Sequence, residues 1–395
     1  MLIARHILSE LETLLTEYPI VTILGPRQAG KTTLAKHFLE GYGYSNLEDP
    51  EQRELAENDP RAFLAGLPDK VIIDEIQRVP ELLSYLQVIV DAKQANGQFV
   101  LTGSHQLSLR EGISQSLAGR TALLHLLPLS ISELAVAGVS YANFEDYAFH
   151  GFLPRIHEQK QRPATAYSNY YQTYVERDVR QLIQVRDSSL FEKMLKLVAG
   201  RSGQIIDYSS LANDVGVDAK TIRHWLSILE ASFILFKLPP YYDNFGKRII
   251  KSPKYYFTDV GLLCFLLGIR ESAQITRDPL VGQIFENLVV IEILKSRYNQ
   301  GQLPDLYYFR DSNGNEVDLI LPEGPKHKAI EIKSAQTFKT EQLKGLRRFK
   351  KLAAGTNESF LIYNGKQQIL SDSITTLNFR DSEQAVCHPQ SGTDS

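Results

Sequence analysis

A phosphate-binding loop near the N-terminus constrains this chain more than any other feature. Residues 21–24, Val-Thr-Ile-Leu, are mostly apolar and favour a β-strand, and the segment from Gly25 to Thr32 fits the pattern G-x-x-x-x-G-K-[ST]. Helix-forming residues follow it directly. The glycines let several backbone N–H groups point at one anion, and the helix adds its positive N-terminal end. The pattern therefore predicts a strand, loop and helix that bind nucleotide phosphates.

Two residues of this loop have specific expected roles in binding ATP. Lys31 would reach the β- and γ-phosphates as a catalytic cation, and the Thr32 hydroxyl would bind Mg²⁺. The predicted cofactors are thus ATP and Mg²⁺. The residues expected to contact the nucleotide are Gly25, Pro26, Arg27, Gln28, Ala29, Gly30, Lys31, Thr32 and Thr33.

A second motif, Val-Ile-Ile-Asp-Glu at residues 71–75, fits the same chemistry. Three apolar β-formers in a row predict a strand buried on both faces, as in a parallel sheet. Carboxylates at the end of such a strand are costly unless they are solvated or serve chemistry. We expect Asp74 to hold Mg²⁺, directly or through water, and Glu75 to be the general base for the attacking water.

A third strand, residues 99–101, ends beside two hydroxyl side chains, Thr102 and Ser104. These hydroxyls would sense the γ-phosphate or orient the attacking water. An ordinary polar loop explains them equally well.

These motifs resemble the AAA+ and related STAND-type P-loop ATPases. Two further runs, Leu-Ala-Gly-Arg-Thr-Ala-Leu-Leu at 117–124 and Leu-Pro-Leu-Ser-Ile-Ser-Glu-Leu at 127–134, resemble a narrower bacterial and archaeal group that carries a C-terminal domain called DUF4143. The resemblance implies that Arg120 begins the last core strand near the nucleotide. There it would act as a sensor or as a finger that reaches a neighbouring subunit, although a surface charge is the simpler alternative.

The length of 395 residues exceeds one ordinary hydrophobic core, so the chain is expected to contain several domains. The predicted class is α/β: an AAA+-like P-loop NTPase with a parallel sheet, then a winged helix, then a restriction-endonuclease-like α/β domain. The expected bounds are 1–150 for the ATPase domain, 151–270 for a helical linker and the winged helix, 271–380 for the nuclease-like domain and 381–395 for a disordered tail.

Composition and charge restrict the classes of partner and the cellular compartment expected for this chain. A net charge of −3 argues against a globally basic nucleic-acid binder and leaves a local basic face open. The two cysteines, Cys264 and Cys387, suggest no disulfide or zinc framework, as expected in a reducing cytoplasm. The early charges do not fit a signal peptide, and the longest uncharged apolar run, residues 260–269, is too short to span a membrane.

Residues 205–258 predict a helix-turn-helix followed by a β-hairpin, the pattern of a winged helix. The helices would cover residues 209–215 and 219–229, with Asp218 as N-cap. Lys220, Thr221 and His224 would share the exposed face of the second helix, and basic residues of the wing would meet phosphates. The residues expected to contact DNA are Arg223, Lys247, Arg248, Lys251 and Lys254. Alternatively, such a module joins domains or binds protein.

Four tyrosines precede this module, and two roles are open for them. They would either stack on bases or pack against a neighbouring domain, and packing is the more common role for aromatics at helical spacing. The residues are Tyr167, Tyr170, Tyr171 and Tyr174.

Residues 281–370 resemble the PD-(D/E)xK nuclease fold. A helix with Glu286 precedes a strand with Asp318 and a strand that carries Glu331 and Lys333. The resemblance implies that Asp318 and Glu331 bind magnesium and that Lys333 positions or activates water. Ordinary strand alternation gives the same short motif, and the fold is also retained without the reaction.

The combined prediction is an ATPase coupled to DNA binding, with metal-dependent DNA cleavage as a further step. The alternative is a STAND-like switch in which ATP controls assembly with a protein partner or a second copy of the chain. In that alternative the nuclease-like domain is not catalytic.

Overall fold

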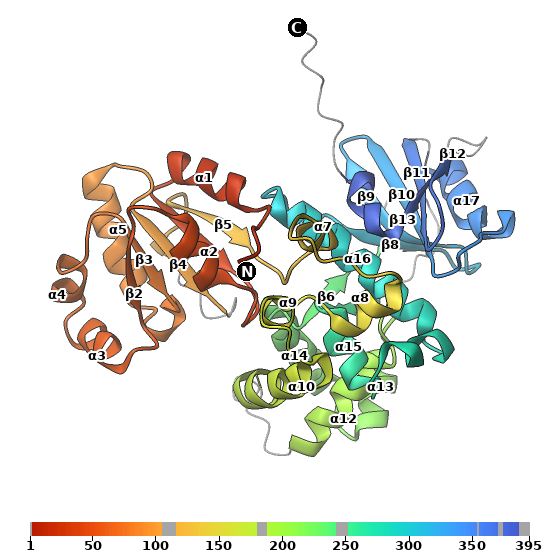
Figure 1. Cartoon of the computed structure of the whole chain (residues 1–395), viewed down its shortest axis with the longest axis horizontal. Coiled ribbons are helices and arrows are strands. Elements are labelled where there is room, and N and C mark those ends of the chain that lie inside the picture. Colours follow the sequence, from red (N-terminus) through yellow and green to blue (C-terminus); the bar gives the residue numbers. More distant parts are fainter. Residues whose placement is uncertain are drawn as a thin grey trace, which may run out of the picture.

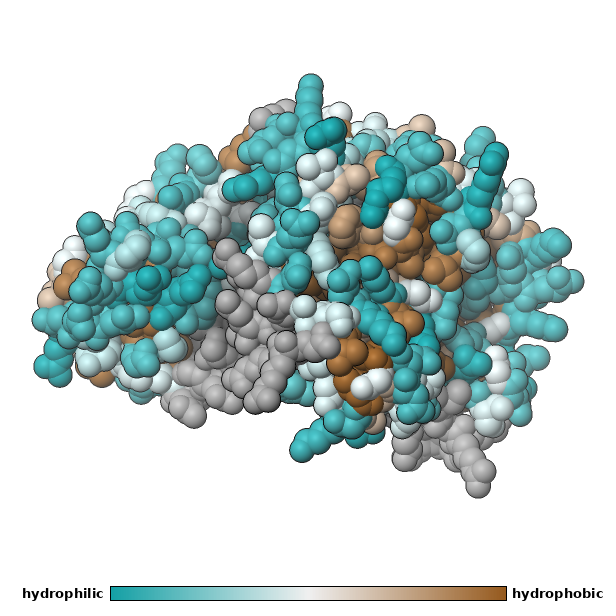
Figure 2. All heavy atoms as spheres, turned by 90° about the horizontal axis from the view of Figure 1, so that it is seen from below, coloured by the Kyte–Doolittle hydropathy of each residue, from teal (hydrophilic) through white to brown (hydrophobic). Residues whose placement is uncertain are grey.

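The computed structural model describes residues 2–104, 116–179, 188–241, 252–353, 355–369 and 374–386. Figure 1 shows an N-terminal domain around one sheet, a helical middle part, and a C-terminal domain around a second sheet. The face drawn in Figure 2 is largely hydrophilic, with hydrophobic residues gathered in patches to the right of its middle. Among the described residues, no helix is both long and apolar enough to cross a membrane.

The N-terminal domain has the P-loop NTPase fold that the motifs predict. Its five strands are parallel and stand in the order β2-β3-β4-β1-β5. Every residue of β1, β3 and β4 is buried, as expected for strands covered by helices on both faces. The strands are β1 (Ile20–Leu24), β2 (Gly43–Asn46), β3 (Val71–Asp74), β4 (Phe99–Gly103) and β5 (Thr121–His125). The helices are α1 (Leu8–Glu17), α2 (Lys31–Phe38), α3 (Pro50–Asn58), α4 (Pro60–Ala65) and α5 (Leu82–Lys93).

The strand register corrects the expected position of Arg120. This residue precedes β5, whose first residue pairs with Ile20 and whose last pairs with Leu24. Arg120 therefore lies at the amino ends of the strands, whereas the phosphate-binding loop follows their carboxyl ends, about 16 Å away for five residues. Its guanidinium binds the Asp91 carboxylate of α5 at 2.6 and 2.8 Å. The sensor role in its own subunit is wrong, and the finger role stays a prediction.

The middle part begins with a series of helices that pack through their aromatic side chains. All four tyrosines are buried, and two of them donate hydrogen bonds: Tyr167 to Asp259 at 2.7 Å and Tyr174 to the Ser232 carbonyl at 2.8 Å. They therefore pack inside the protein and are not a base-stacking surface. The helices are α7 (Ile131–Val136), α8 (Phe144–His150), α9 (Pro154–Glu158), α10 (Pro163–Tyr170), the π-helical η2 (Tyr171–Val179) and α12 (Ser188–Ala199).

The predicted helix-turn-helix is confirmed. It consists of α13 (Tyr208–Val215) and α14 (Ala219–Ala231). Gly216 ends the first helix with φ 96°, a left-handed conformation that glycine tolerates, and the Asp218 carboxylate accepts from the Thr221 N–H. Two antiparallel strands follow at the predicted places, β6 (Leu235–Leu238) and β7 (Lys254–Phe257).

The C-terminal domain is a mixed six-stranded sheet in the order β12-β13-β11-β10-β9-β8. The long helix α16 (Val281–Asn299) contacts this sheet, and α17 (Lys344–Leu352) lies at its outer side in Figure 1. The short helices are α15 (Val260–Leu266), η3 (Ser272–Arg277) and η4 (Thr340–Leu343). The strands are β8 (Tyr307–Arg310), β9 (Glu316–Glu323), β10 (Lys326–Lys333), β11 (Thr356–Tyr363), β12 (Gln368–Ile369) and β13 (Ile374–Asn378).

The predicted disordered tail, residues 381–395, starts inside a folded segment. Phe379–Ala385 form the helix η5, and the side chains of Ala385 and Val386 are buried. These residues are part of the C-terminal domain because their apolar side chains complete its core. Residues 387–395 lie outside the described part of the chain.

Candidate functional site

The phosphate-binding loop lies between β1 and α2 and encloses the Lys31 ammonium group. Its Nζ donates to the carbonyls of Gly25 and Pro26, both at 2.9 Å. Gly30 has φ 94°, and a Cβ on Gly25 would lie 2.0 Å from the Leu126 carbonyl oxygen, so both positions need glycine. Burial lowers the pKa of Lys31. The loop thus holds a cation where the phosphates of a nucleotide would meet it.

The predicted Mg²⁺ ligands lie in contact. The Thr32 hydroxyl is 2.9 and 3.2 Å from the two carboxylate oxygens of Asp74, which also accepts hydrogen bonds from Tyr44 and Thr102. A hydroxyl and a carboxylate are oxygen ligands of the kind that Mg²⁺ prefers, so these residues fit the ion and would hold it beside the phosphates. Tyr44 was missed because only the pairing of β2 with β3 brings it here.

Glu75 follows β3 in a left-handed conformation, with φ 59°. Its backbone N–H donates to the Thr102 hydroxyl at 3.1 Å, and its carboxylate binds the side-chain amide of Gln77. The same amide donates to Ser104 at 3.1 Å. The structure brings the predicted base and both hydroxyls together, while their roles in hydrolysis remain predictions. Gln77 was missed, although it stands two residues after the acidic pair.

The other predicted nucleotide-binding residues of the loop are Arg27, Gln28, Ala29 and Thr33. Arg27 forms an ion pair with Glu48 at 3.1 Å, and Gln28 has a left-handed backbone with φ 62°. Thr33 lies in the first turn of α2. The Ala29 carbonyl accepts a hydrogen bond of 2.7 Å from Arg5, a residue that sequence reasoning did not select.

Arg5 is buried and joins three segments of the N-terminal domain. Besides the Ala29 carbonyl, its guanidinium binds the Leu127 carbonyl at 2.7 Å and the Glu133 carboxylate at 3.0 Å. Glu133 also accepts from the backbone N–H groups of His6 and Ser130. Burial raises the pKa of Glu133, but Arg5 and these hydrogen bonds outweigh it and hold the pKa below its ordinary value. The carboxylate is therefore ionised and fully paired.

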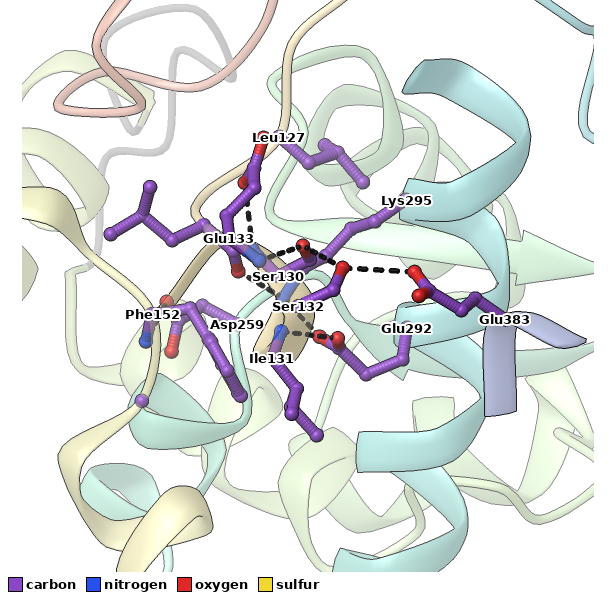
Figure 3. Close-up of polar contacts among 12 residues, drawn as sticks. Leu127, Ser130, Ile131, Ser132, Glu133, Phe152, Asp259, Glu292, Lys295 and Glu383 are labelled. Carbon is purple, nitrogen blue, oxygen red and sulfur yellow. Dashed lines mark hydrogen bonds and ion pairs between the residues drawn. The ribbon is translucent and has the colours of Figure 1, made fainter. Parts of the chain in front are cut away.

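The same region connects to α16, as Figure 3 shows. The backbone N–H of Ile131 donates to Glu292 at 2.7 Å, and Lys295 donates to the Leu129 carbonyl at 2.7 Å. Lys295 and Glu292 are also paired, at 2.6 Å. We call the set Arg5, Glu133, Glu292 and Lys295 the buried polar network. Its two pairs are joined through the backbone of residues 129–133, so that the network links the phosphate-binding loop to α16.

A second candidate site lies where α16, β9 and β10 meet. Lys333 is 2.6 Å from the Glu331 carboxylate and 3.6 Å from that of Asp318, so the structure brings the three predicted residues together. Burial and the neighbouring Asp318 raise the pKa of Glu331 to about 8. Burial and Asp318 also raise the pKa of Glu286 on α16. We call Glu286, Glu316, Asp318 and Glu331 the acidic cluster.

The predicted role of Lys254 as a DNA contact of the wing is wrong. Its side chain is buried and pairs with Glu286 and Glu316 of the acidic cluster, because β7 places it inside the protein. Arg223 is exposed on α14, as expected, with its guanidinium 5.1 Å from the Tyr208 ring. Lys247, Arg248 and Lys251 lie outside the described residues.

The acidic cluster as it stands does not fit the magnesium predicted at Asp318 and Glu331. Across the described ranges, no three or more His, Cys, Asp or Glu side chains are arranged so that they could hold a metal ion. Lys254 and Lys333 neutralise the carboxylates instead. The cleavage role of Lys333 therefore stays a prediction.

The buried ion pair between Arg5 and Glu133 should contribute strongly to stability. Glu133→Ala leaves the Arg5 guanidinium buried without its carboxylate, and breaking such a pair costs about 3–5 kcal/mol. Urea unfolding followed by circular dichroism measures the loss. Asp91→Ala is the control, because it removes the exposed partner of Arg120 and should change stability little. Equal effects of the two substitutions would contradict the importance of the buried pair.

The raised pKa of Glu331 predicts a pH dependence of stability. The folded protein keeps this proton up to about pH 8, whereas the ordinary pKa is 4.5. Its contribution to stability is therefore fully present below pH 4.5 and is lost as the pH rises to about 8. Glu331→Gln cannot titrate and should flatten the free energy of unfolding between roughly pH 5 and 8. A slope unchanged in this variant would assign the titration to another group.

Comparison with known families agrees with this division of sites. A family model described as "AAA domain" matches residues 17–135, and one described as "Domain of unknown function (DUF4143)" matches residues 281–380. Between them, a model described as "Domain of unknown function (DUF8612)" matches residues 141–273.

Relatives cover most of the chain. An uncharacterized protein of Mycobacterium tuberculosis, Rv2008c, is 32% identical over 338 residues, which are 84% of this chain and 74% of that protein. An uncharacterized protein of Methanocaldococcus jannaschii, MJ1637, is 26% identical over 388 residues, with 84% and 79% covered.

Solved structures give partial matches. The Walker-type ATPase PABY2304 of Pyrococcus abyssi aligns with a TM-score of 0.45 and 16% identity, over 67% of this chain and 96% of that one. The STAND protein PH0952 of Pyrococcus horikoshii aligns with a TM-score of 0.22 and 14% identity, over 74% and 46%. On its sequence relatives and the family models that it matches, this chain belongs to the family of P-loop ATPases that carry a C-terminal DUF4143 domain.

Proposed function

We propose that this protein hydrolyses ATP at the phosphate-binding loop and couples the nucleotide cycle to DNA binding. One observation supports the coupling above others. The Ala29 carbonyl of the loop binds Arg5, Arg5 binds Glu133, and the α7 region that Glu133 caps is bonded to Glu292 and Lys295 of α16. A change in the loop conformation on hydrolysis would therefore reach α16 through buried groups, because a buried charge that loses one partner is strongly destabilised.

The helix α16 leads toward the rest of the protein. It carries Glu286 of the acidic cluster, and its buried Asn287 exchanges hydrogen bonds of 2.8 Å with the backbone N–H and carbonyl of Phe257 in β7. It thus contacts the ATPase domain at one end and the β6–β7 sheet and acidic cluster at the other. This position suits an element that transmits a nucleotide-dependent movement.

Two basic surfaces support DNA as the partner. Lys220, Arg223 and His224 are exposed on α14. The helix α17, which sequence reasoning did not select, buries Leu346 and Phe349 and contains no acidic residue. Its basic side chains are Lys344, Arg347, Arg348, Lys350 and Lys351. Such clusters favour the phosphate backbone even though the whole chain has a net charge of −3.

Nucleotide binding and hydrolysis should separate in two variants. Lys31→Ala removes the cation that faces the phosphates and should weaken nucleotide binding. Glu75→Gln should keep binding and slow turnover about 100-fold or more, because the amide is not a base. Titration with a fluorescent nucleotide and a phosphate-release assay measure the two steps, with exposed Lys93→Ala as control. Turnover at the wild-type rate in Glu75→Gln would remove this residue from the mechanism.

DNA should stimulate ATP turnover through the α14 surface. The double variant Lys220→Ala/Arg223→Ala should bind duplex DNA more weakly and lower the slope of log K against log salt by up to about two units. The control Lys93→Ala/Lys196→Ala removes the same charge from exposed ion pairs elsewhere. Fluorescence anisotropy across salt concentrations, and turnover with duplex and single-stranded DNA, are the measurements.

The coupling has its own test. Glu292→Gln/Lys295→Met removes both charges of the buried pair at similar volume, so the fold should survive. This variant should hydrolyse ATP and bind DNA while DNA no longer stimulates turnover. Stimulation equal to that of the wild type would contradict the coupling through α16. If DNA neither binds nor stimulates the wild type, the STAND-like switch with a protein partner becomes the better hypothesis.

A further inference from the structure

Tyr44 reaches the nucleotide site from β2, a strand at the edge of the N-terminal sheet. Its hydroxyl donates a hydrogen bond of 2.7 Å to the Oδ2 atom of Asp74. Because β2 runs parallel to β3, Tyr44 lies opposite Ile72 and Asn46 lies opposite Asp74. The tyrosine side chain therefore spans the two residues that separate its own register position from the carboxylate at the end of β3.

The Tyr44 side chain is held in this position by a second contact. The ammonium nitrogen of Lys36 lies 3.5 Å from the centre of the tyrosine ring, a cation–π contact with the helix α2. Burial raises the pKa of Tyr44, and the hydrogen bond to Asp74 raises it further. The hydroxyl therefore keeps its proton and acts as the donor. The side chain links β3 to the helix that follows the phosphate-binding loop.

Three hydroxyl groups fix the orientation of the Asp74 carboxylate. Tyr44 and Thr32 donate to Oδ2 at 2.7 and 2.9 Å, and Thr102 donates to Oδ1. Thr32 is also an expected Mg²⁺ ligand, since a hydroxyl that donates its hydrogen to a carboxylate still offers a lone pair to an ion. Tyr44 does not belong to the expected ligand set. Its hydrogen bond acts on the carboxylate alone.

We propose that Tyr44 is a positioning residue of the Mg²⁺ site, whose hydroxyl holds the Asp74 carboxylate in the orientation that binds the ion. The inference rests on the proposed function, because it assigns a role within the same nucleotide site. Groups that hydrogen-bond to a metal-binding side chain orient it, and their loss typically weakens metal binding about 10- to 100-fold. Without the tyrosine hydroxyl, Oδ2 keeps the Thr32 hydrogen bond and loses the one that comes from β2.

The test is Tyr44→Phe, which removes the hydroxyl and keeps the ring. Binding of a fluorescent, non-hydrolysable ATP analogue to the full chain is measured in chelator and then across Mg²⁺ concentrations. The affinity in chelator should equal that of the wild type, because the phosphate-binding loop is intact. The Mg²⁺ concentration that gives half of the gain in affinity should rise about 10-fold or more.

Tyr42→Phe is the matched control. The Tyr42 hydroxyl donates to the Gly97 carbonyl at 2.6 Å, and the ring lies near the ammonium group of Lys70. Both tyrosines are partly buried, so the two substitutions remove the same group from similar surroundings. The control should leave the Mg²⁺ requirement at its wild-type value, because its hydrogen bond does not involve Asp74.

A double-mutant comparison tests whether Tyr44 acts through Asp74. Asp74→Asn removes the carboxylate, so adding Tyr44→Phe should not weaken binding of the analogue further at a fixed Mg²⁺ concentration. A further loss of the same size as in the wild-type background would overturn the proposal. An unchanged Mg²⁺ requirement in Tyr44→Phe would overturn it as well, while nucleotide binding by the wild type would leave the proposed function standing. A wild-type chain that binds no nucleotide at any Mg²⁺ concentration would overturn both.

Discussion

The buried guanidinium of Arg5 is the constraint on which the arrangement of the nucleotide site depends. A charge inside a protein is tolerated only when each hydrogen-bonding direction finds a partner. Arg5 meets this condition with the carbonyls of Ala29 and Leu127 and with the Glu133 carboxylate. The first residues of the chain, the phosphate-binding loop and the start of α7 are held together as a result. None of these segments could shift without leaving a charge or a carbonyl unpaired.

The helix α16 contacts both the N-terminal domain and the rest of the protein. One side of α16 is bonded to α7 through Glu292 and Lys295, and Asn287 and Glu286 on the same helix meet β7. Lys295 also lies 3.7 Å from the centre of the Phe152 ring. These contacts are buried and specific in direction, unlike apolar packing, which tolerates sliding. They explain how a domain with an acidic cluster can be positioned relative to a nucleotide site far away in sequence.

Buried lysines recur at these junctions and within the C-terminal sheet. Lys31, Lys254, Lys295 and Lys328 are all nearly inaccessible, and each is held by carbonyls or carboxylates. The first is held by carbonyls of its own loop, which suits a cation that meets a ligand. The others pair with carboxylates, which suits a structural role. The same residue type thus has different chemistry because its oxygen partners differ in charge.

The sequence alone determined the fold of the N-terminal domain and the form of its phosphate-binding loop, because the strand, loop and helix that make the loop are adjacent in the chain. The contact of Thr32 with Asp74 follows from the parallel sheet, which brings the carboxyl ends of β1 and β3 to the same edge. It also located the helix-turn-helix and placed Glu331 and Lys333 on one face of a strand, since alternate residues of a strand share a face. Asp318 meets them through the antiparallel pairing of β9 with β10, the neighbouring strands that the sequence pattern predicted. Tertiary structure decided the rest. The register of β5 places Arg120 at the amino ends of the strands, away from the phosphate-binding loop. The burial of β7 places the Lys254 side chain inside the protein. Arg5 and Tyr44 acquired partners through contacts between elements that are distant in the chain, which no local pattern encodes. Gln77 lies two residues from its partner Glu75, and only its contact with Ser104 depends on the pairing of β3 with β4.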